Sequence, residues 1–164
     1  MKIKKNIVIK AFTLIELIVV LIIIAAVALF SLPKLHYLYA RYIVDLHVRE
    51  MQSILDFARS SAIHSGRSTV LCASLDRKHC NAQINRSWIL FFLADKVDVV
   101  EQPSQLIKVY SSDYKGHWQF NRNFLIRFAS NGKLSSQNGT LTYTFGKYTG
   151  KVILSKSGRI RREK

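Results

Sequence analysis

The stretch AFTLIEL, residues 11–17, decides the fold of this chain, because it opens an unbroken apolar run that continues to Phe30. The 21 residues numbered 12–32 contain only three polar side chains, those of Thr13, Glu16 and Ser31. As a helix with a rise of ~1.5 Å per residue, this segment is about 30 Å long, which matches the hydrocarbon core of a bilayer. The sequence therefore predicts an amino-terminal helix that spans a membrane.

Glu16 is out of place in such a helix, since a carboxylate at mid-membrane costs on the order of 2.5–3.5 kcal/mol and needs a cationic partner. Residues 1–11 carry four lysines and no acid, which is typical of the cytoplasmic flank of a targeting segment. A cut between Ala11 and Phe12 would create an α-amino group four residues before Glu16, on the same helix face. We therefore expect Glu16 to neutralise an amino terminus, its own or that of a neighbouring subunit, during assembly.

Residues 10–16, followed by the apolar run and Pro33, resemble the class III signal and the amino-terminal helix of type IV pilins and type II secretion pseudopilins. The resemblance implies that prepilin peptidase cuts before Phe12 and methylates the new amine, and that the helix then packs into a filament core. The family usually has glycine before the cut, whereas this chain has Ala11, which is still small.

The charge is strongly asymmetric along the chain. The formal net charge is +15, and the stretch from Lys115 to Lys164 contains eleven lysines or arginines against one acid, Glu163. Such a distribution indicates a polyanionic partner, either nucleic acid or anionic lipid headgroups, with a generally solvated basic surface as the alternative.

Cys72 and Cys80 are the only cysteines. Because the lysine-rich start is expected to stay in the cytoplasm, the rest of the chain lies where disulfides persist, and a Cys72–Cys80 bridge is predicted. His79 next to Cys80 raises the alternative of a metal site, but the spacing lacks paired zinc ligands. We expect no metal and no cofactor.

After Pro33 the apolar residues recur at steps of three and four as far as Ala62, and Gly66 is a candidate cap for the end of the helix. The predicted organisation is a leader (1–11), a transmembrane or filament-core half of the helix (12–33), an amphipathic half (34–66) and a globular β-rich domain (67–164). Asp56, Ser60 and His64 share one helix face, which we attribute to surface polarity rather than to a hydrolase site.

The β-rich domain has short runs of β-branched and aromatic residues between turn residues such as Asn131-Gly132, Asn138-Gly139, residues 148–150 and Ser157-Gly158. The fold class is therefore α+β, a long amino-terminal helix packed on an antiparallel β-sheet, as in pilins. The predicted strands are Ser68–Ala73, Ser87–Leu93, Gln105–Ser111, His117–Phe120, Leu125–Ala129, Leu141–Phe145, Lys151–Ser155 and Arg159–Arg162.

From Ala11 onward the chain resembles the GspH/FimT group of minor pilins and pseudopilins, through motifs that recur in the same order. They are residues 58–63, 70–72, Cys80, Trp88, 126–132 and 152–155. Its tail resembles the Gly-Arg-x-Arg motif of FimT-type minor pilins, which implies binding of extracellular DNA at the pilus during natural transformation. Gly158, Arg159 and Arg161 match this motif, and charge and proximity add Lys151, Lys156 and Arg162.

Alternation along a short strand after Ser157-Gly158 would place Arg159 and Arg161 on one face and Ile160 against the core. Without a recognition-helix motif, binding of DNA should be directed at the phosphates and independent of sequence. Tyr143, Phe145 and Tyr148 could stack on bases, but we assign them to the core.

The leading hypothesis is a FimT-like, DNA-binding minor pilin. The alternative is a structural tip or priming subunit of a type IV pilus or a type II secretion pseudopilus that does not bind DNA. Both place the chain first in the inner membrane, as a single-pass protein with a periplasmic head, and then in a surface filament with other pilin subunits. No phosphate-binding loop, nucleophile elbow or carboxylate cluster indicates an enzyme.

Overall fold

The computed structural model describes residues 13–81, 87–94, 98–111, 116–122, 125–135 and 138–163, without the side chains of residues 30–34. The predicted leader and its cleavage site at Ala11 and Phe12 lie outside the described residues. The chain divides into two compact units, Met1–Tyr39 and Ala40–Lys164. The second is called the head unit below.

Helix α1 runs from Leu14 to Ser65 without interruption through Pro33, as predicted. Its first turn is stabilised by Thr13, whose hydroxyl oxygen accepts a hydrogen bond from the backbone N–H of Glu16 at 3.3 Å. Its end coincides with Gly66, which has a φ of 65° and confirms the expected glycine cap.

Within the described part of the chain, no helix contains a segment that is both long enough and apolar enough to cross a membrane. The predicted span at 12–33 includes Phe12 and side chains that lie outside the described residues, so it stays a prediction.

The strands form two antiparallel four-stranded sheets. The sequence predicted an antiparallel sheet but not that the strands divide into two sheets. The first sheet has the order β3-β2-β1-β5 and the second has the order β4-β6-β7-β8. A 3₁₀ turn at Pro103–Gln105 precedes β3. The strands are β1 (Thr69–Ala73), β2 (Ser87–Phe92), β3 (Leu106–Ser111), β4 (His117–Phe120), β5 (Leu125–Phe128), β6 (Gly139–Phe145), β7 (Tyr148–Leu154) and β8 (Ile160–Glu163).

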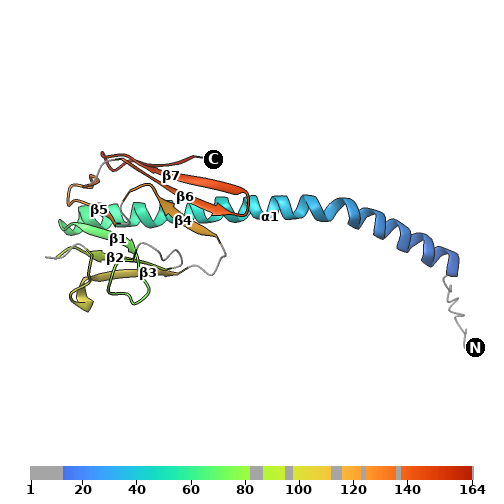
Figure 1. The fold of residues 1–164 in the computed structure, drawn as a ribbon, viewed down its shortest axis with the longest axis horizontal. Helices are drawn as coiled ribbons and strands as arrows, with labels where there is room; N and C mark the ends of the chain where they lie inside the picture. Colours follow the sequence, from blue (N-terminus) through green and yellow to red (C-terminus); the bar gives the residue numbers. More distant parts are fainter. Residues whose placement is uncertain are drawn as a thin grey trace, which may run out of the picture. The chain divides into compact units, whose positions relative to one another are not determined.

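The head unit has one main core, to which α1 and both sheets contribute. In Figure 1, β6 and β7 lie on one side of the carboxyl-terminal part of α1, and β1, β2 and β3 lie on the other. One face of the helix is buried, and the inward side chains of both sheets join it. The largest fully buried members of this core are Leu55, Leu71, Leu90, Ile126, Phe128, Leu141 and Leu154.

The two sheets differ in the burial of their outer faces. The far face of the first sheet is also buried, in a second cluster that includes Val70, Ile89, Phe91 and Val100. The second sheet instead alternates along β6 between buried residues and half-buried threonines. Its outer face is therefore available to solvent, which is usual for an antiparallel sheet with one packed face.

The hairpin between β6 and β7 turns at Gly146 and Lys147, so the turn predicted at 148–150 is wrong. Gly150 lies inside β7, because a Cβ there would come within 2.7 Å of Val48 Cγ2 and 2.8 Å of Val44 Cγ1. This glycine serves close packing of the helix against the second sheet rather than a turn.

We predict that Gly150→Val lowers the free energy of unfolding by about 1–3 kcal/mol, because it forces apart a closely packed contact between helix and sheet. Urea denaturation of the full chain in neutral detergent, followed by fluorescence of the buried Trp88 and Trp118, measures the change. Thr149→Val, at an exposed neighbouring position, is the control and should stay within about 0.5 kcal/mol of the wild type. Equal stability of both variants would contradict the packing role of Gly150.

Candidate functional site

The carboxyl-terminal turn between β7 and β8 has the geometry that the sequence predicted. The N–H of Gly158 donates to Ser155 O at 2.8 Å, and the N–H of Ser155 donates to Arg159 O at 2.9 Å. Gly158 has a φ of 82°, a conformation that favours glycine. Ile160 is half-buried against the main core, while Arg159 and Arg161 are exposed. The pattern of one inward residue between two outward arginines is confirmed.

Gly158 is buried because it lies against a second turn, at Asn131 and Gly132. A Cβ on Gly158 would collide with the carbonyl oxygen of Gly132. Arg59, on α1, donates from Nε to the same carbonyl at 3.1 Å. The glycine of the Gly-Arg-x-Arg motif therefore joins the tail to the helix and to the turn after β5, and any other residue would separate them.

The remaining predicted residues lie on different faces of the second sheet. Lys151 is on the outer face of β7, where its register partner in β8 is Glu163. Arg162 is the partner of the buried Val152, so strand alternation puts it on the face of Ile160, away from Arg161. Lys156 lies in the turn itself and is exposed.

The electrostatics of this region are one-sided. The described residues from 116 to 163 contain nine lysines or arginines and one acid, Glu163. The ion pairs found in the described chain are His47–Glu50, Arg49–Asp45 and His79–Asp76, so they involve none of these nine cations. Like charges that are not balanced by ion pairs raise the free energy of the folded protein, and a bound polyanion relieves that cost.

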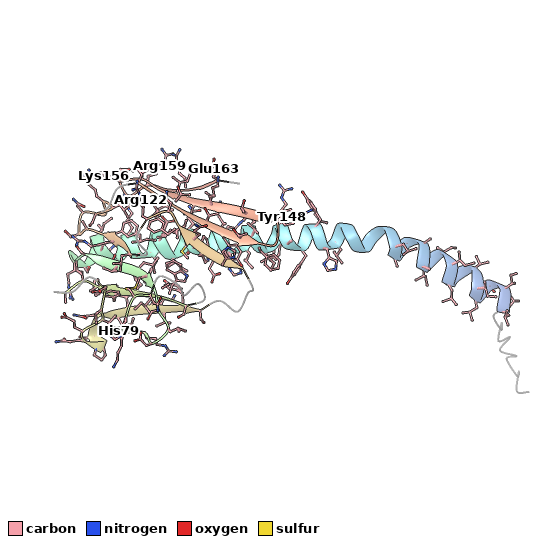
Figure 2. The ribbon with its side chains drawn as sticks, viewed as in Figure 1. His79, Arg122, Tyr148, Lys156, Arg159 and Glu163 are labelled. Atoms are coloured by element: carbon pink, nitrogen blue, oxygen red, sulfur yellow. A yellow bond between two sulfur atoms is a disulfide. The ribbon has the colours of Figure 1, made fainter. Side chains whose placement is uncertain are left out.

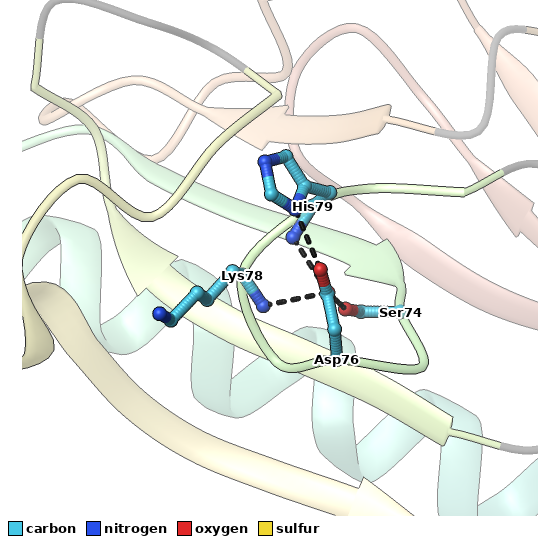
Figure 3. A network of polar contacts seen from close by, with 4 residues as sticks. All are labelled: Ser74, Asp76, Lys78 and His79. Atoms are coloured by element: carbon cyan, nitrogen blue, oxygen red, sulfur yellow. Dashed lines mark hydrogen bonds and ion pairs between the residues drawn. The ribbon is translucent and has the colours of Figure 1, made fainter.

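The disulfide between Cys72 and Cys80 is confirmed, with a Cα–Cα distance of 5.6 Å. The loop that it closes is organised by Asp76 (Figure 3). Asp76 Oδ1 accepts hydrogen bonds from Ser74 Oγ and from the backbone N–H groups of Lys78 and His79, at 3.1, 2.9 and 2.8 Å. The hydrogen bonds from the side chain and the backbone N–H of His79, followed by that from the backbone of Lys78, hold the pKa of Asp76 well below its ordinary value.

The alternative of a metal site at His79 and Cys80 finds no supporting arrangement of ligands in the described residues. The His79 ring is directed toward Asp76, since its Nδ1 lies 2.5 Å from Asp76 Oδ2. Among the residues that the structure describes, no group of three or more potential ligands is arranged to hold a metal ion.

The polar residues on the helix face of Asp56 have structural roles. His64 Nδ1 lies 2.8 Å from Ser60 O, and Ser60 Oγ donates to Phe57 O, so both side chains serve the helix backbone. Burial raises the pKa of Asp56, and the nearby Arg59 guanidinium opposes that shift.

The aromatic residues near the tail belong to the core, as expected. Tyr143 is only 2% exposed, and Phe145 and Tyr148 are half-buried against the main core. They are therefore not presented to a ligand as a stacking surface.

Glu16 lies in the first turn of α1, with its side chain exposed. The pairing of Thr13 with Glu16 has the spacing of a capping box, in which a glutamate at the third helical position favours the helix start. A second role of Glu16, at the start of the helix, is therefore possible on this spacing besides the predicted role in assembly. An experiment has to separate the two.

Sequence reasoning did not select Arg59 as part of the site. Its partner Gly132 is 73 residues away in the chain, so no local pattern relates the two. The signal that was available is the Asn131-Gly132 turn, which the sequence did predict and which Gly132 forms with a φ of 73°.

A long amino-terminal helix whose second half packs on antiparallel sheets defines a pilin-like subunit, and comparison with solved structures agrees. The type IV minor pilin FimU of Pseudomonas aeruginosa matches with a TM-score of 0.61 and 18% identity, covering 76% of this chain and 90% of that chain. The minor pseudopilin EpsH from the type 2 secretion system of Vibrio cholerae matches with a TM-score of 0.52 and 13% identity, covering 73% and 95%. No curated protein matches the chain by sequence.

The family model for the type II transport protein GspH matches residues 47–158, and the chain belongs to this family. It is thus a minor pilin or pseudopilin of a type IV pilus or a type II secretion system. The family and the structural neighbours are structural pilins rather than enzymes, and membership implies assembly with other pilin subunits.

We predict that the stability of the disulfide-closed loop falls in acid through Asp76. Because its folded-state pKa is lowered, the contribution of the ionised carboxylate is complete above about pH 4 and is lost as the pH falls below its unfolded value. Between pH 5 and pH 2, the thermal midpoint of the wild type should therefore decrease more steeply than that of Asp76→Asn. Glu101→Gln, at another exposed acid, serves as the control. Parallel curves for wild type and Asp76→Asn would refute the role of Asp76.

Proposed function

We propose that this chain is a minor pilin that binds extracellular DNA through the turn between β7 and β8, in the uptake of DNA during natural transformation. The observation that carries the proposal is the exposed pair Arg159 and Arg161, in a region whose described cations have no ion pair with a carboxylate. In Figure 2 the side chain of Arg159 projects from the surface near Lys156.

Arginine suits this task because its planar guanidinium binds phosphate oxygens in a bidentate manner, whereas lysine acts as a point charge. The turn presents Arg159 just before β8 and Arg161 on β8, the short strand at the edge of the second sheet. Lys156 and Lys151 are nearby in the chain. Contacts of this kind are made to the phosphate backbone, so the binding is independent of base sequence and is weakened by salt.

The proposal includes a route to the surface. Prepilin peptidase cuts between Ala11 and Phe12, and the chain waits in the inner membrane as a single-pass protein with its head in the periplasm. Glu16 then pairs with an N-terminal amine as the subunit enters the filament. The apolar run of residues 17–30 and the lysine-rich start support this order of events.

The likeness to EpsH supports a second candidate. In this alternative, the chain is a structural subunit of a secretion pseudopilus, and its basic surface binds DNA no better than any protein of equal charge. Measurement of DNA affinity against charge-matched variants separates the two functions.

We predict that Arg159→Ala/Arg161→Ala weakens binding of the full chain, in neutral detergent, to duplex DNA by roughly ten- to a hundredfold at 0.1 M salt. A wild-type site of about three to five phosphates gives a slope of log affinity against log salt near −0.9 per phosphate, and the double variant should lose about two of these contacts. Fluorescence anisotropy at several salt concentrations measures both quantities.

The matched control is Arg41→Ala/Lys147→Ala, which removes two exposed cations outside the site. The site assignment is wrong if this control weakens binding as much as the substitution of Arg159 and Arg161. An undetectable affinity of the wild type at low salt would leave the structural alternative.

We predict that Glu16→Gln leaves membrane insertion intact but reduces incorporation into filaments several-fold, because the amide carries no charge to pair with the amine. Glutamine suits the third position of a capping box as glutamate does, so the variant tests charge apart from helix capping. Immunoblots of sheared filaments and of membranes measure the two pools. Normal incorporation of Glu16→Gln, together with a defect in Glu16→Ala, would assign Glu16 to the helix start alone.

A further inference from the structure

We infer that the DNA site is wider than the tail and includes Arg122 and Lys133, because the fold ties their two turns to the turn between β7 and β8. The inference rests on the proposed function and enlarges its site. Neither residue belongs to the Gly-Arg-x-Arg motif, and they lie 36 and 25 residues before Gly158 in the sequence.

Lys133 is brought to the site by the turn after β5. The N–H of Leu134 donates to Lys156 O at 3.1 Å, so the backbone next to Lys133 lies beside the turn between β7 and β8. Gly132, immediately before Lys133, is the residue against which Gly158 packs. Lys133 is exposed. Its backbone N–H donates to Asn131 Oδ1 at 3.0 Å, and this bond fixes the backbone conformation at Lys133.

Arg122 is brought to the site by Asn138. The backbone oxygen of Asn138 accepts from Arg122 Nε at 3.4 Å, and its side-chain Oδ1 accepts from the N–H of Lys156 at 2.6 Å. A single residue therefore connects the end of β4 to the turn between β7 and β8. Asn121 adds a second connection, since its Oδ1 accepts from the N–H of Thr140 at 2.8 Å. Figure 2 shows Arg122, Lys156 and Arg159 at the same end of the second sheet.

The chemistry of these two side chains fits phosphate. The bond to Asn138 uses only Nε of Arg122, so both terminal nitrogens of its guanidinium remain available for a phosphate group. Neither Arg122 nor Lys133 forms an ion pair with a described carboxylate. Successive phosphates of one DNA strand are about 3.4 Å apart along the axis, so cations on three adjoining turns can meet several of them.

The three turns are held by specific contacts rather than by sequence proximity. Arg59 supports the turn that carries Lys133, and Asn138 supports Arg122 and Lys156 together. The site is therefore formed only in the folded head unit, and a peptide with the sequence of the tail would lack Arg122 and Lys133.

The test uses the full chain in neutral detergent, with a fluorescent duplex of random sequence as the probe and anisotropy at several salt concentrations as the readout. We expect Arg122→Gln and Lys133→Gln each to reduce the salt slope by about 0.9 and the double variant to reduce it by nearly twice that amount. Affinity at 0.1 M salt should fall by several-fold for each. Arg122→Lys, which keeps the charge but loses the bond from Nε, should retain most of the slope.

The matched control is Lys147→Gln, which removes the same charge from the turn at the other end of β7. In Figure 2 the adjacent Tyr148 marks that end, away from Lys156 and Arg159. If the double variant behaves as Lys147→Gln does while substitution of Arg159 and Arg161 still weakens binding at least tenfold, the wider site is wrong and the proposed function stands. If the wild type itself does not bind, both fail. Far-UV circular dichroism verifies that each variant is folded.

Discussion

The burial of one apolar face of α1 between two sheets is the interaction on which the head unit depends. Among the residues that the structure describes, no second α-helix covers the inward side chains of either sheet, so Leu55 and the residues around it complete the core for both. The contact is close at Gly150, where the absence of a side chain lets β7 approach Val44 and Val48. This packing fixes the second sheet on the helix, and with it the turn that carries the tail.

The basic surface follows from this arrangement. Because the helix covers only the inner face of the second sheet, the outer face and the turns at its edge remain in solvent. Arg59 reaches from the same helix to Gly132, and Gly158 packs against that residue. The backbone that carries the exposed arginines of the tail is thus held by these contacts, although the arginines are among the last residues of the chain. A backbone that is already held loses less conformational entropy when its side chains bind phosphate.

Membership of the GspH family makes the chain one subunit among others in a filament. Within that setting, the disulfide-closed loop around Asp76 and the basic turns are features of the head unit, whereas Glu16 belongs to the start of the helix. The chemistry of assembly and the chemistry of the exposed surface are therefore carried by separate parts of the sequence.

Sequence by itself determined those features that depend on near neighbours in the chain. The helix to Gly66, the approximate positions of the eight strands, the bridge from Cys72 to Cys80 and the inward direction of Ile160 follow from periodicity, turn residues and compartment. Only the tertiary structure decided that the strands divide into two sheets, that Gly150 belongs to a strand, and that Asn138 joins Arg122 to Lys156. The physical reason is that these features arise from contacts between segments distant in the chain, whose free energy depends on how whole elements pack and leaves no period in the sequence.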